Sequence, residues 1–193
     1  MNENLTKAEL RSAALLRRGA LDEKYRSYAE SKALLHLVST EEFSCADKIL
    51  LYFPVKSEAD PLPLFEIAKE QDKKIAFPKC NKNDLTMNFF EVCSRNDLIP
   101  GAYNIPEPNG DTGELSCDER TLCIVPALLY SRDGHRLGWG KGYYDRFLAD
   151  FDGITVGFTY DAFVVDELPC TEHDVALDMI ITEKGVYRCE RKA

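Results

Sequence analysis

The spacing of apolar residues along the chain predicts two helices near the amino terminus. A Thr-Lys-Ala-Glu sequence at positions 6–9 is a capping box, with a hydroxyl at the cap and a carboxylate three residues later. We therefore expect a helix that runs to about Arg18 and is interrupted at Gly19. Asp22 is the expected cap of a second helix that reaches about Ser39, because apolar positions recur behind it at helical spacing.

Further along, continuous apolar runs bounded by polar residues are typical of strands that are buried on both faces. The runs KILLYF and LCIVP are the clearest of these. The expected strands are Lys48–Phe53, Lys74–Phe77, Thr86–Val92, Leu122–Pro126, Ile154–Phe158 and Met179–Thr182, with an edge strand over Val186–Cys189. Helices are expected over Leu62–Gln71 and from about Gly142. Pro100–Cys117 contains three glycines, three prolines and two asparagines, so we expect a loop there.

Apolar strands that alternate with helices predict an α/β fold. A chain of 193 residues fits one domain. We therefore expect a single domain over residues 1–193, built as a three-layer, Rossmann-like sandwich with a mostly parallel central sheet. Ligands of such folds bind at the carboxyl ends of the strands, so the loops at 54–60, 78–84 and 130–142 are the places to look for a site.

Composition narrows the classes of partner. The chain has 24 basic and 33 acidic residues, a net charge of −9, so we do not expect it to bind nucleic acid. The longest clean apolar run, Cys123–Tyr130, is far shorter than the roughly 20 residues that span a bilayer, and no secretory signal is expected. The seven cysteines include no Cys-x-x-Cys pair and no histidine has zinc-ligand spacing, which indicates free thiols in a reducing cytoplasm.

Four of the eleven glycines lie between Gly134 and Gly142, in DGHRLGWGKG. Glycine lets the backbone approach a ligand closely, and backbone N–H groups can then bind phosphate. Arg136 and Lys141 add positive charge. The run is not a Walker A loop, because a glycine follows Lys141, and its glycines lack the GxGxxG spacing. The spacing alone is compatible with a polyphosphate site or with a flexible turn.

Several charged residues have both a functional and an ordinary interpretation. Asp145 lies in the first turn after the glycine run and is either a Mg²⁺ ligand beside the phosphates or a surface acid. Glu58 follows the first strand and either accepts hydrogen bonds from ligand N–H groups or merely belongs to a turn. Lys7, Arg11 and Arg18 fall within about 40° on one helix face, which is either a phosphate clamp or a solvated cationic face.

The stretch RLGWGKGYYDR at Arg136–Arg146 closely resembles the signature of the 5-formyltetrahydrofolate cyclo-ligases, also called methenyltetrahydrofolate synthetases. Other segments are similar to that family in the same order: KAELR at Lys7–Arg11, SEAD at Ser57–Asp60, FPK at Phe77–Lys79 and NIPEP at Asn104–Pro108. The resemblance covers about Lys7 to Thr182. Ala127 and Ser131 depart from it, since glycine and aspartate are expected there.

The resemblance implies that 5-formyltetrahydrofolate, with or without further glutamates, is converted to 5,10-methenyltetrahydrofolate, with ATP and Mg²⁺ required and ADP and phosphate released. Phosphorylation of the formyl oxygen would activate the formyl carbon, N10 would attack it, and phosphate would leave. The protein would align the reactants and neutralise the phosphates. The resemblance further implies amino-terminal helices that pack over the nucleotide site, and we expect a cytoplasmic monomer.

The resemblance assigns roles residue by residue. ATP would be bound by Lys7, Arg11, Arg136, Leu137, Gly138, Trp139, Gly140, Lys141, Gly142, Tyr143 and Tyr144, of which Arg136, Lys141 and Tyr143 would be catalytic. The folate would be bound by Phe53, Glu58, Trp139, Gly140, Lys141, Gly142 and Tyr143. Asp145 and Asp174 would ligate Mg²⁺, and Lys79 would assist a phosphate or the glutamate tail.

Two other functions are compatible with the residues. An ATP-dependent enzyme of the same fold could act on a different substrate, such as a thiamine-related formyl compound, because the pterin pocket is built from scattered residues. A non-catalytic module that binds nucleotide or folate is the other alternative. The joint presence of Lys7, Arg11, Glu58, Lys141 and Asp145 argues against such a module.

Overall fold

A seven-stranded sheet divides the molecule into layers, with the strand order β12-β11-β9-β6-β1-β2-β3. The computed structural model describes residues 5–101, 104–109 and 112–189. The five inner strands run parallel, and β3 and β12 are antiparallel edges. The strands are β1 (Lys48–Leu50), β2 (Lys74–Cys80), β3 (Met87–Glu91), β6 (Thr121–Val125), β9 (Ile154–Phe158), β11 (Met179–Thr182) and β12 (Gly185–Arg188).

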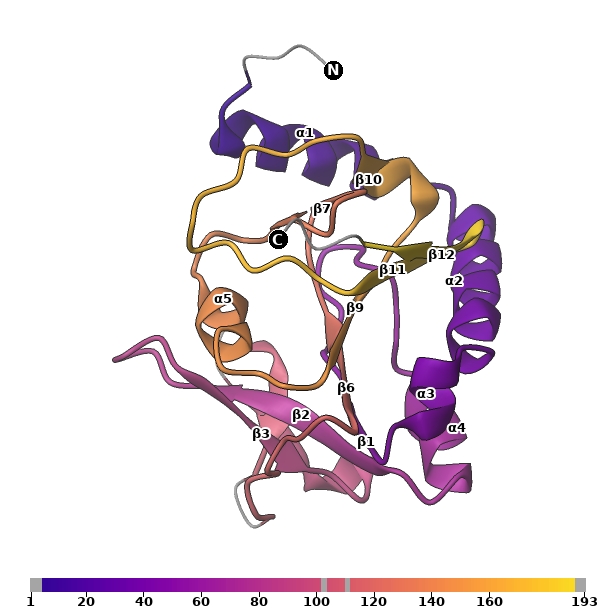
Figure 1. Ribbon diagram of the computed structural model, residues 1–193, viewed down its shortest axis with the longest axis vertical. Helices are drawn as coiled ribbons and strands as arrows, with labels where there is room; N and C mark the ends of the chain where they lie inside the picture. The colour runs from indigo at the N-terminus through magenta and orange to yellow at the C-terminus, as the bar shows by residue number, and fades with distance from the viewer. Residues whose placement is uncertain (1–4, 102–103, 110–111, 190–193) are drawn as a thin grey trace.

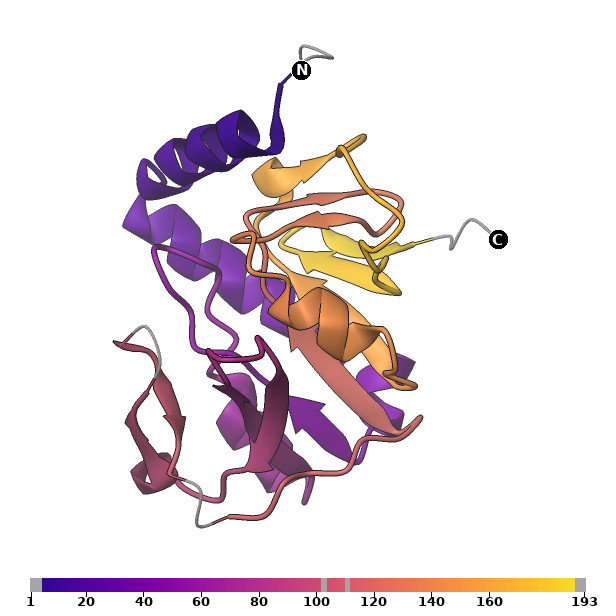
Figure 2. The same cartoon turned by 90° about the vertical axis from the view of Figure 1, so that its left-hand side faces the viewer.

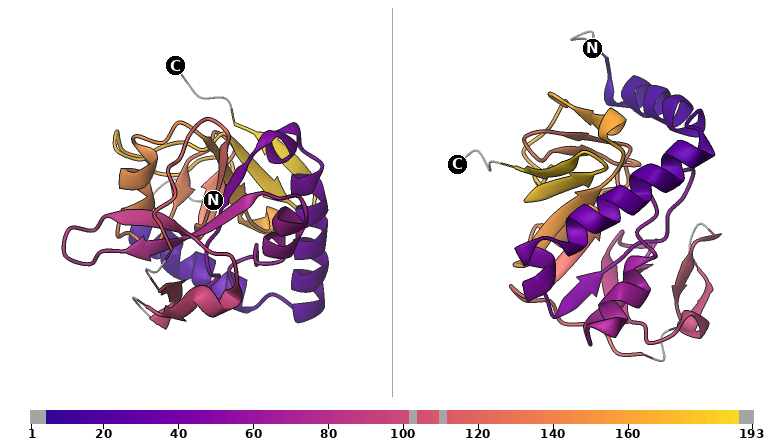
Figure 3. Two further views of the ribbon diagram at one scale, coloured as in Figure 1. Left: turned by 90° about the horizontal axis from the view of Figure 1, so that it is seen from below. Right: turned by 90° about the vertical axis from the view of Figure 1, so that its right-hand side faces the viewer.

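Helices cover both faces of this sheet (Figure 1). The helices are α1 (Lys7–Gly19), α2 (Glu23–Val38), α3 (Glu41–Cys45), α4 (Leu64–Glu70) and α5 (Tyr143–Leu148). In Figure 1, α2, α3 and α4 lie on one side of the sheet and α5 on the other, whereas α1 lies at one end. Figure 3 shows α2 running across the sheet with α1 beyond its end. The expected three-layer α/β sandwich is confirmed.

Strand β6 shows how the two cores are separated. Leu122 and Ile124 belong to the core beneath α2, α3 and α4, whereas Cys123 and Val125 belong to the core beneath α5. Alternate residues of a strand point to opposite faces, so a strand covered by helices on both sides is apolar throughout. This is the physical reason for the continuous run that marked the strand in the sequence.

The amino-terminal helices form as the sequence predicts. Thr6 caps α1 and forms the full capping box with Glu9, the helix ends at Gly19, and the side chain of Asp22 caps α2. No helix in the described part of the chain is long and apolar enough to cross a membrane.

Two strand predictions need correction in length. β1 ends at Leu50, short of the predicted Phe53, because the chain leaves the sheet after the amide of Leu51 donates to Ala76 O. β2 continues past Phe77 to Cys80, because the edge strand β3 pairs with it along that stretch.

Two small sheets were not predicted. One contains β7 (Leu129–Ser131), β8 (Arg136–Leu137) and β10 (Val164–Val165), and the other is a hairpin of β4 (Leu98–Pro100) and β5 (Pro106–Pro108). The hairpin lies beside the lower part of the main sheet (Figure 2). A continuous loop over Pro100–Cys117 is therefore wrong, since β5 pairs with β4 despite its two prolines. Positions 102–103 and 110–111 of that predicted loop, and the ends of the 1–193 domain, lie outside the described residues.

Candidate functional site

Helix α1 is bound directly to the glycine-rich loop. The Nε atom of Arg11 donates to the carbonyl of Gly138 at 2.8 Å. The ammonium of Lys7 lies 2.7 Å from Asp174 Oδ2, in the segment that leads to β11. Arg11 therefore contacts the loop that follows β8, and Lys7 contacts the segment before β11. The interpretation of these cations as a phosphate clamp stays a prediction.

The loop between β8 and α5 needs glycine at particular positions. Gly140 and Gly142 have φ values of +90° and +70°, which are strained for any other residue. A Cβ atom on Gly140 would also lie only 3.1 Å from Arg11 Nη2, whereas one on Gly138 would meet nothing within 4 Å. Gly140 therefore allows α1 to pack against the loop.

Asp145 follows Lys141 by four residues, so the spacing predicts that both lie on one helix face, and this prediction is wrong. Lys141 precedes Gly142, which caps α5 in the left-handed conformation, so Lys141 is not on the helix and cannot share a face with Asp145 at i+4. Its carbonyl instead accepts a hydrogen bond from Arg146 Nη2 at 2.7 Å. Asp145 does lie in the first turn of α5, as expected, but its partner is Arg136.

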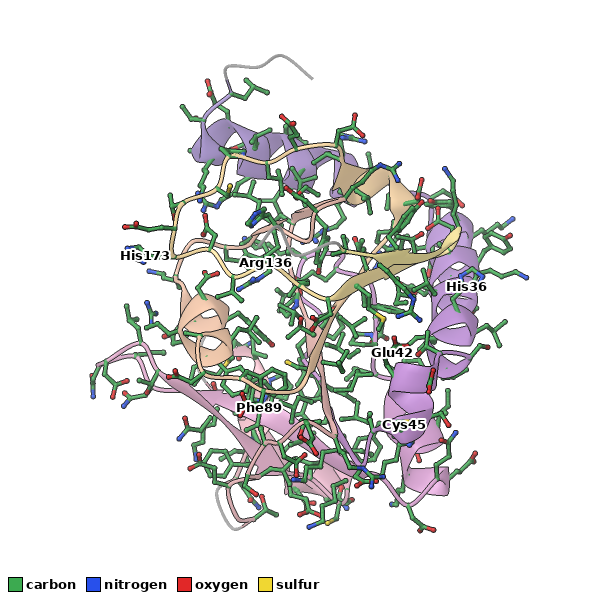
Figure 4. The ribbon with its side chains drawn as sticks, viewed as in Figure 1. His36, Glu42, Cys45, Phe89, Arg136 and His173 are labelled. Atoms are coloured by element: carbon green, nitrogen blue, oxygen red, sulfur yellow. The ribbon has the colours of Figure 1, made fainter. Side chains whose placement is uncertain are left out.

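Arg136 joins three parts of the site. One of its terminal nitrogens lies 2.7 Å from Asp145 Oδ1 on α5, and the other donates to the carbonyl of Val175. Its side chain is 4% exposed. Figure 4 shows Arg136 above α5, whereas His173, from the segment between β10 and β11, lies at the periphery. Both terminal nitrogens of Arg136 thus already have protein partners, and its contact with a phosphate stays a prediction.

The two predicted Mg²⁺ ligands each pair with a cation. Asp174 accepts hydrogen bonds from Lys7 and from the amide of Thr171. Burial raises the pKa of Asp174, but these hydrogen bonds outweigh burial and lower the pKa overall. The described residues contain no group of three or more His, Cys, Asp or Glu side chains that could hold a metal. Asp145 and Asp174 already pair with Arg136 and Lys7, and their role as Mg²⁺ ligands stays a prediction.

Glu58 is a buried carboxylate in a strained turn. Its side chain is 3% exposed; Oε2 accepts from the amide of Val55 at 3.0 Å and Oε1 from Trp139 Nε1 at 2.9 Å. The turn places Lys56 and Ser57 at φ values of +46° and +64°. Left-handed backbone costs about 1–2 kcal/mol for such residues. The carboxylate of Glu58 is thus held in place despite the cost of backbone strain and of burial. Such local strain is typical of a functional site.

Burial raises the pKa of Glu58, and hydrogen bonds from Val55 and Trp139 together with the positive charge of Arg18 oppose the rise. Arg18 Nη2 lies 3.8 Å from Glu58 Oε1, and the arginine is itself 2% exposed. The sequence grouped Arg18 with Lys7 and Arg11 on one helix face, either a phosphate clamp or a solvated face, and did not connect Arg18 with Glu58. Its burial shows that this face is not a solvated one at Arg18.

An apolar cavity of about 450 Å³ opens beside Phe53. Phe53 stacks on Phe77 with ring centroids 4.7 Å apart. The other residues that line the cavity are Leu62, Phe65, Leu98, Ile99, Pro100, Asn104 and Pro106. The expectation that Phe53 contacts a flat ligand is compatible with this cavity, which the unpredicted hairpin helps to close.

A second, polar groove of about 590 Å³ contains Lys79. Lys82 and the side-chain amides of Asn81, Asn83 and Asn88 lie along it, and Glu107 is its carboxylate. The ammonium of Lys79 lies 5.9 Å from the centre of the Phe90 ring.

The remaining predicted residues differ in how they could meet a ligand. The side chain of Leu137 is buried in the core, so only its backbone faces the loop. Tyr143 packs against the core beneath α5, with the Arg146 guanidinium 5.9 Å from its ring centre. The hydroxyl of Tyr144 is buried and has no hydrogen-bond partner among the described residues. Trp139 is 37% exposed, and the ammonium of Lys56 lies 4.8 Å from the centre of its ring.

The architecture is that of an α/β enzyme whose site gathers at the carboxyl ends of parallel strands. The chain belongs to the 5-formyltetrahydrofolate cyclo-ligase family, whose sequence profile matches residues 3–183, and is therefore a ligase. The resemblance of the glycine-loop signature is thus confirmed at the level of the family.

Similar proteins cover nearly the whole chain. A solution structure from Aquifex aeolicus, described as a 5,10-methenyltetrahydrofolate synthetase, is 34% identical with a TM-score of 0.84, covering 98% of this chain and 95% of that one. A 5,10-methenyltetrahydrofolate synthetase structure from Mycoplasma pneumoniae is 27% identical with a TM-score of 0.73, covering 93% and 99%. The 5-formyltetrahydrofolate cyclo-ligase of Escherichia coli K12 is 25% identical, covering 89% and 97%.

Proposed function

We propose that the protein converts 5-formyltetrahydrofolate to 5,10-methenyltetrahydrofolate with ATP and Mg²⁺, and releases ADP and phosphate. The observation that carries this proposal is the direct bond between Trp139 of the glycine loop and Glu58, at 2.9 Å. The loop and α1 offer cations and backbone to a nucleotide, and Glu58 offers a carboxylate to a substrate. Because this hydrogen bond joins the two regions, a nucleotide at the loop and a substrate at Glu58 would be neighbours, as transfer of a phosphoryl group between them requires.

The chemistry follows from the poor reactivity of a formamide. The formyl oxygen attacks the γ-phosphorus, the bond to the β–γ bridging oxygen breaks, and ADP leaves. N10 then attacks the activated formyl carbon and loses its proton to solvent, and the C–O bond breaks as phosphate leaves. No covalent bond to the protein forms, so catalysis consists of alignment and charge neutralisation.

Nucleotide phosphates are assigned to α1 and the glycine loop. Arg11 lies at the loop, Lys7 lies beside Asp174, and Lys141 is exposed at the end of the loop, so each would offer a positive charge to the phosphates. The backbone of the loop supplies N–H donors. Arg136 would act by holding Asp145 and the backbone at Val175 in place, and Tyr143 would contact both ligands, as the family resemblance implies. These roles rest on proximity and on family resemblance.

Asp145 and Asp174 would hold Mg²⁺ when it is bound. The ion would supply further neutralisation of the phosphate charge. Arg136 and Lys7 already pair with these carboxylates, which holds the two acids in position.

The folate is assigned to Glu58 and to the cavity beside Phe53. An ionised carboxylate accepts charge-assisted hydrogen bonds from the N–H edge of a pterin, and it can accept more than the two bonds it has in the protein. The stacked Phe53 and Phe77 rings offer an apolar wall to a flat ring.

The glutamate tail is assigned to the groove that contains Lys79. Phe77 of the apolar cavity and Lys79 of the groove are two residues apart on β2 and so share a face. A folate seated at Phe53 could therefore extend its tail toward Lys79 and Lys82. The expected result is a lower KM for the triglutamate than for the monoglutamate, with the difference reduced by Lys79→Ala. An equal preference in both proteins would contradict this assignment.

We expect a monomer, and all seven cysteines are free thiols, which suits a reducing compartment such as the cytoplasm. The direct test of function is incubation with 5-formyltetrahydrofolate, ATP and Mg²⁺, followed by the near-ultraviolet band of the methenyl product. The expected result is a band that needs all three components. Turnover of a thiamine-related formyl compound in preference to the folate, or binding of both ligands without product, would favour one of the two alternatives.

A further inference from the structure

The guanidinium of Arg18 is buried in an unusual way. Its side chain is 2% exposed, and Nη1 donates to the carbonyl of Ala127 at 3.0 Å. Nε and Nη2 are also buried but have no hydrogen-bond partner among the described residues. Arginine stays protonated inside proteins, so a permanent positive charge lies here with donors unused. Unsatisfied buried donors destabilise a fold, which makes a purely structural role a poor explanation.

The charge of Arg18 faces Glu58. Nη2 lies 3.8 Å from Glu58 Oε1, beyond hydrogen-bond length but well within the range of a strong electrostatic attraction at low exposure. The carboxylate is held at this distance by Trp139 and by the amide of Val55. A buried carboxylate without a cation would tend to take up a proton, and a protonated carboxyl would lose one acceptor oxygen.

The other groups around Glu58 cannot supply the same compensation. The hydroxyls of Tyr52, Tyr130 and Tyr144 are the titratable groups that also face this region, and burial raises the pKa of each, so they stay neutral. The hydroxyls of Tyr52 and Tyr130 donate to backbone carbonyls at 2.7 Å.

Lys56, the cation of the same turn, stacks on the exposed Trp139 ring instead.

We propose that Arg18 is a positioning residue for substrate recognition, whose buried guanidinium keeps Glu58 ionised and correctly placed for the N–H edge of the folate. This inference rests on the proposed function, because it is Glu58 that would bind the pterin. Arg18 lies on the helix that also carries Lys7 and Arg11. The same helix would therefore contribute cations to the nucleotide site and, through Glu58, to the folate site.

The test compares Arg18→Met with Arg17→Met, a change at the exposed neighbouring arginine. Arg18→Met is expected to raise the KM for 5-formyltetrahydrofolate at least about tenfold, the loss typical of a weakened charge-assisted hydrogen bond. ATP binding measured without folate should stay within about twofold, a change of less than 1 kcal/mol. Arg18→Lys should restore part of the folate affinity because it keeps the charge. Arg17→Met should leave both constants unchanged.

A second readout does not need the substrate. The carboxyl of Glu58 is titrated by carbon-13 NMR, with its signal assigned by Glu58→Gln, and the pKa should rise in Arg18→Met. In the Glu58→Gln background, Arg18→Met should cause no further loss of folate affinity. If Arg18→Met does not fold, Arg18→Gln, which is also neutral but can still donate to Ala127 O, carries the same expectations.

An unchanged titration of Glu58, or losses of folate affinity that multiply in the double variant, would overturn the inference and leave Arg18 as a structural contact. Failure of the wild-type protein to form the methenyl product would instead refute the proposed function. The NMR titration judges the pairing of Arg18 and Glu58 in either case.

Discussion

The indole nitrogen of Trp139 donates a hydrogen bond to Glu58 Oε1 at 2.9 Å, across 81 positions of sequence. Trp139 belongs to the loop that Arg11 contacts through Gly138, and Glu58 belongs to the turn that follows β1. The hydrogen bond therefore couples the position of the glycine loop to that of the Glu58 carboxylate. A ligand that orders the loop should therefore also order Glu58, so we expect nucleotide and folate to assist each other's binding.

Trp139→Phe tests this bond, because it keeps an aromatic ring and removes the N–H donor. A hydrogen bond to a charged group contributes about 1.5–3 kcal/mol, so the folate KM should rise roughly tenfold to a hundredfold. ATP binding in the absence of folate should change little. Steady-state kinetics and calorimetric titration with ATP measure the two effects. A Trp139→Phe enzyme with normal folate KM would mean that the bond has no part in recognition.

Gly140→Ala and Gly138→Ala form a matched pair within the loop. Gly140 has a φ of +90° and its new methyl group would press on Arg11, whereas Gly138 has open space. Gly140→Ala should destabilise the protein by about 1–2 kcal/mol and raise the KM for ATP. Gly138→Ala should have a much smaller effect on both the stability and the KM for ATP. Urea unfolding and ATP kinetics report the difference, and equal behaviour of the two variants would refute the close packing of α1 on the loop.

Lys7→Ala and Arg11→Ala should each raise the KM for ATP. Both side chains are partly exposed, and the Lys7–Asp174 pair is of the kind that contributes about 0–1 kcal/mol, so stability should fall by no more than that. Lys24→Ala, at an exposed lysine on α2, is the control. Normal ATP kinetics in the Lys7→Ala/Arg11→Ala double variant would restore the interpretation of this surface as a solvated cationic face.

Asp145→Ala should weaken the response of turnover to Mg²⁺, and Lys141→Ala should lower turnover, while both proteins stay folded. Asp150→Ala, at an exposed acid just beyond α5, is the control for the aspartate. The measurement is the rate of product formation against Mg²⁺ concentration at saturating ATP. Full turnover in the Lys141→Ala/Asp145→Ala double variant would remove both residues from the proposed site.

The burial of Glu58 predicts a specific pH dependence of stability. Its pKa in the folded protein is raised above the ordinary value of 4.5, with burial as the main cause. A raised pKa means that the stability contributed by Glu58 is present below the unfolded-state pKa and is lost as the pH rises through the folded-state pKa. The free energy of unfolding of the wild type minus that of Glu58→Gln should therefore fall as the pH rises above about 4.5. A difference that grows with pH would show that the carboxylate is stabilised in the fold.

The layered fold could be predicted from the sequence because the signals for its helices and strands are local. The Thr6–Glu9 capping box, the Asp22 cap and the apolar run of β6 each depend on neighbouring residues. The β4–β5 hairpin lacked such a signal, since proline-rich strands resemble loops and the pairing depends on tertiary contacts.

The sequence named candidate site residues but not the contacts that they make with one another. The glycine loop, Glu58 and Asp145 were identified from residue type and family resemblance. That Arg136 pairs with Asp145, or that Arg18 lies behind Glu58, depends on chain segments that meet only in the folded protein. Lys141 was misplaced because the left-handed Gly142 starts the helix one residue later than the spacing suggested.

The most direct test of the proposed reaction follows the formyl oxygen. 5-Formyltetrahydrofolate labelled with oxygen-18 in the formyl group is incubated with the enzyme, ATP and Mg²⁺, and the released phosphate is analysed by mass spectrometry. If ATP phosphorylates the formyl oxygen, one labelled oxygen appears in phosphate for each methenyl product formed. Phosphate without the label, formed at the same rate as the product, would show that the formyl oxygen leaves as water and would contradict the account.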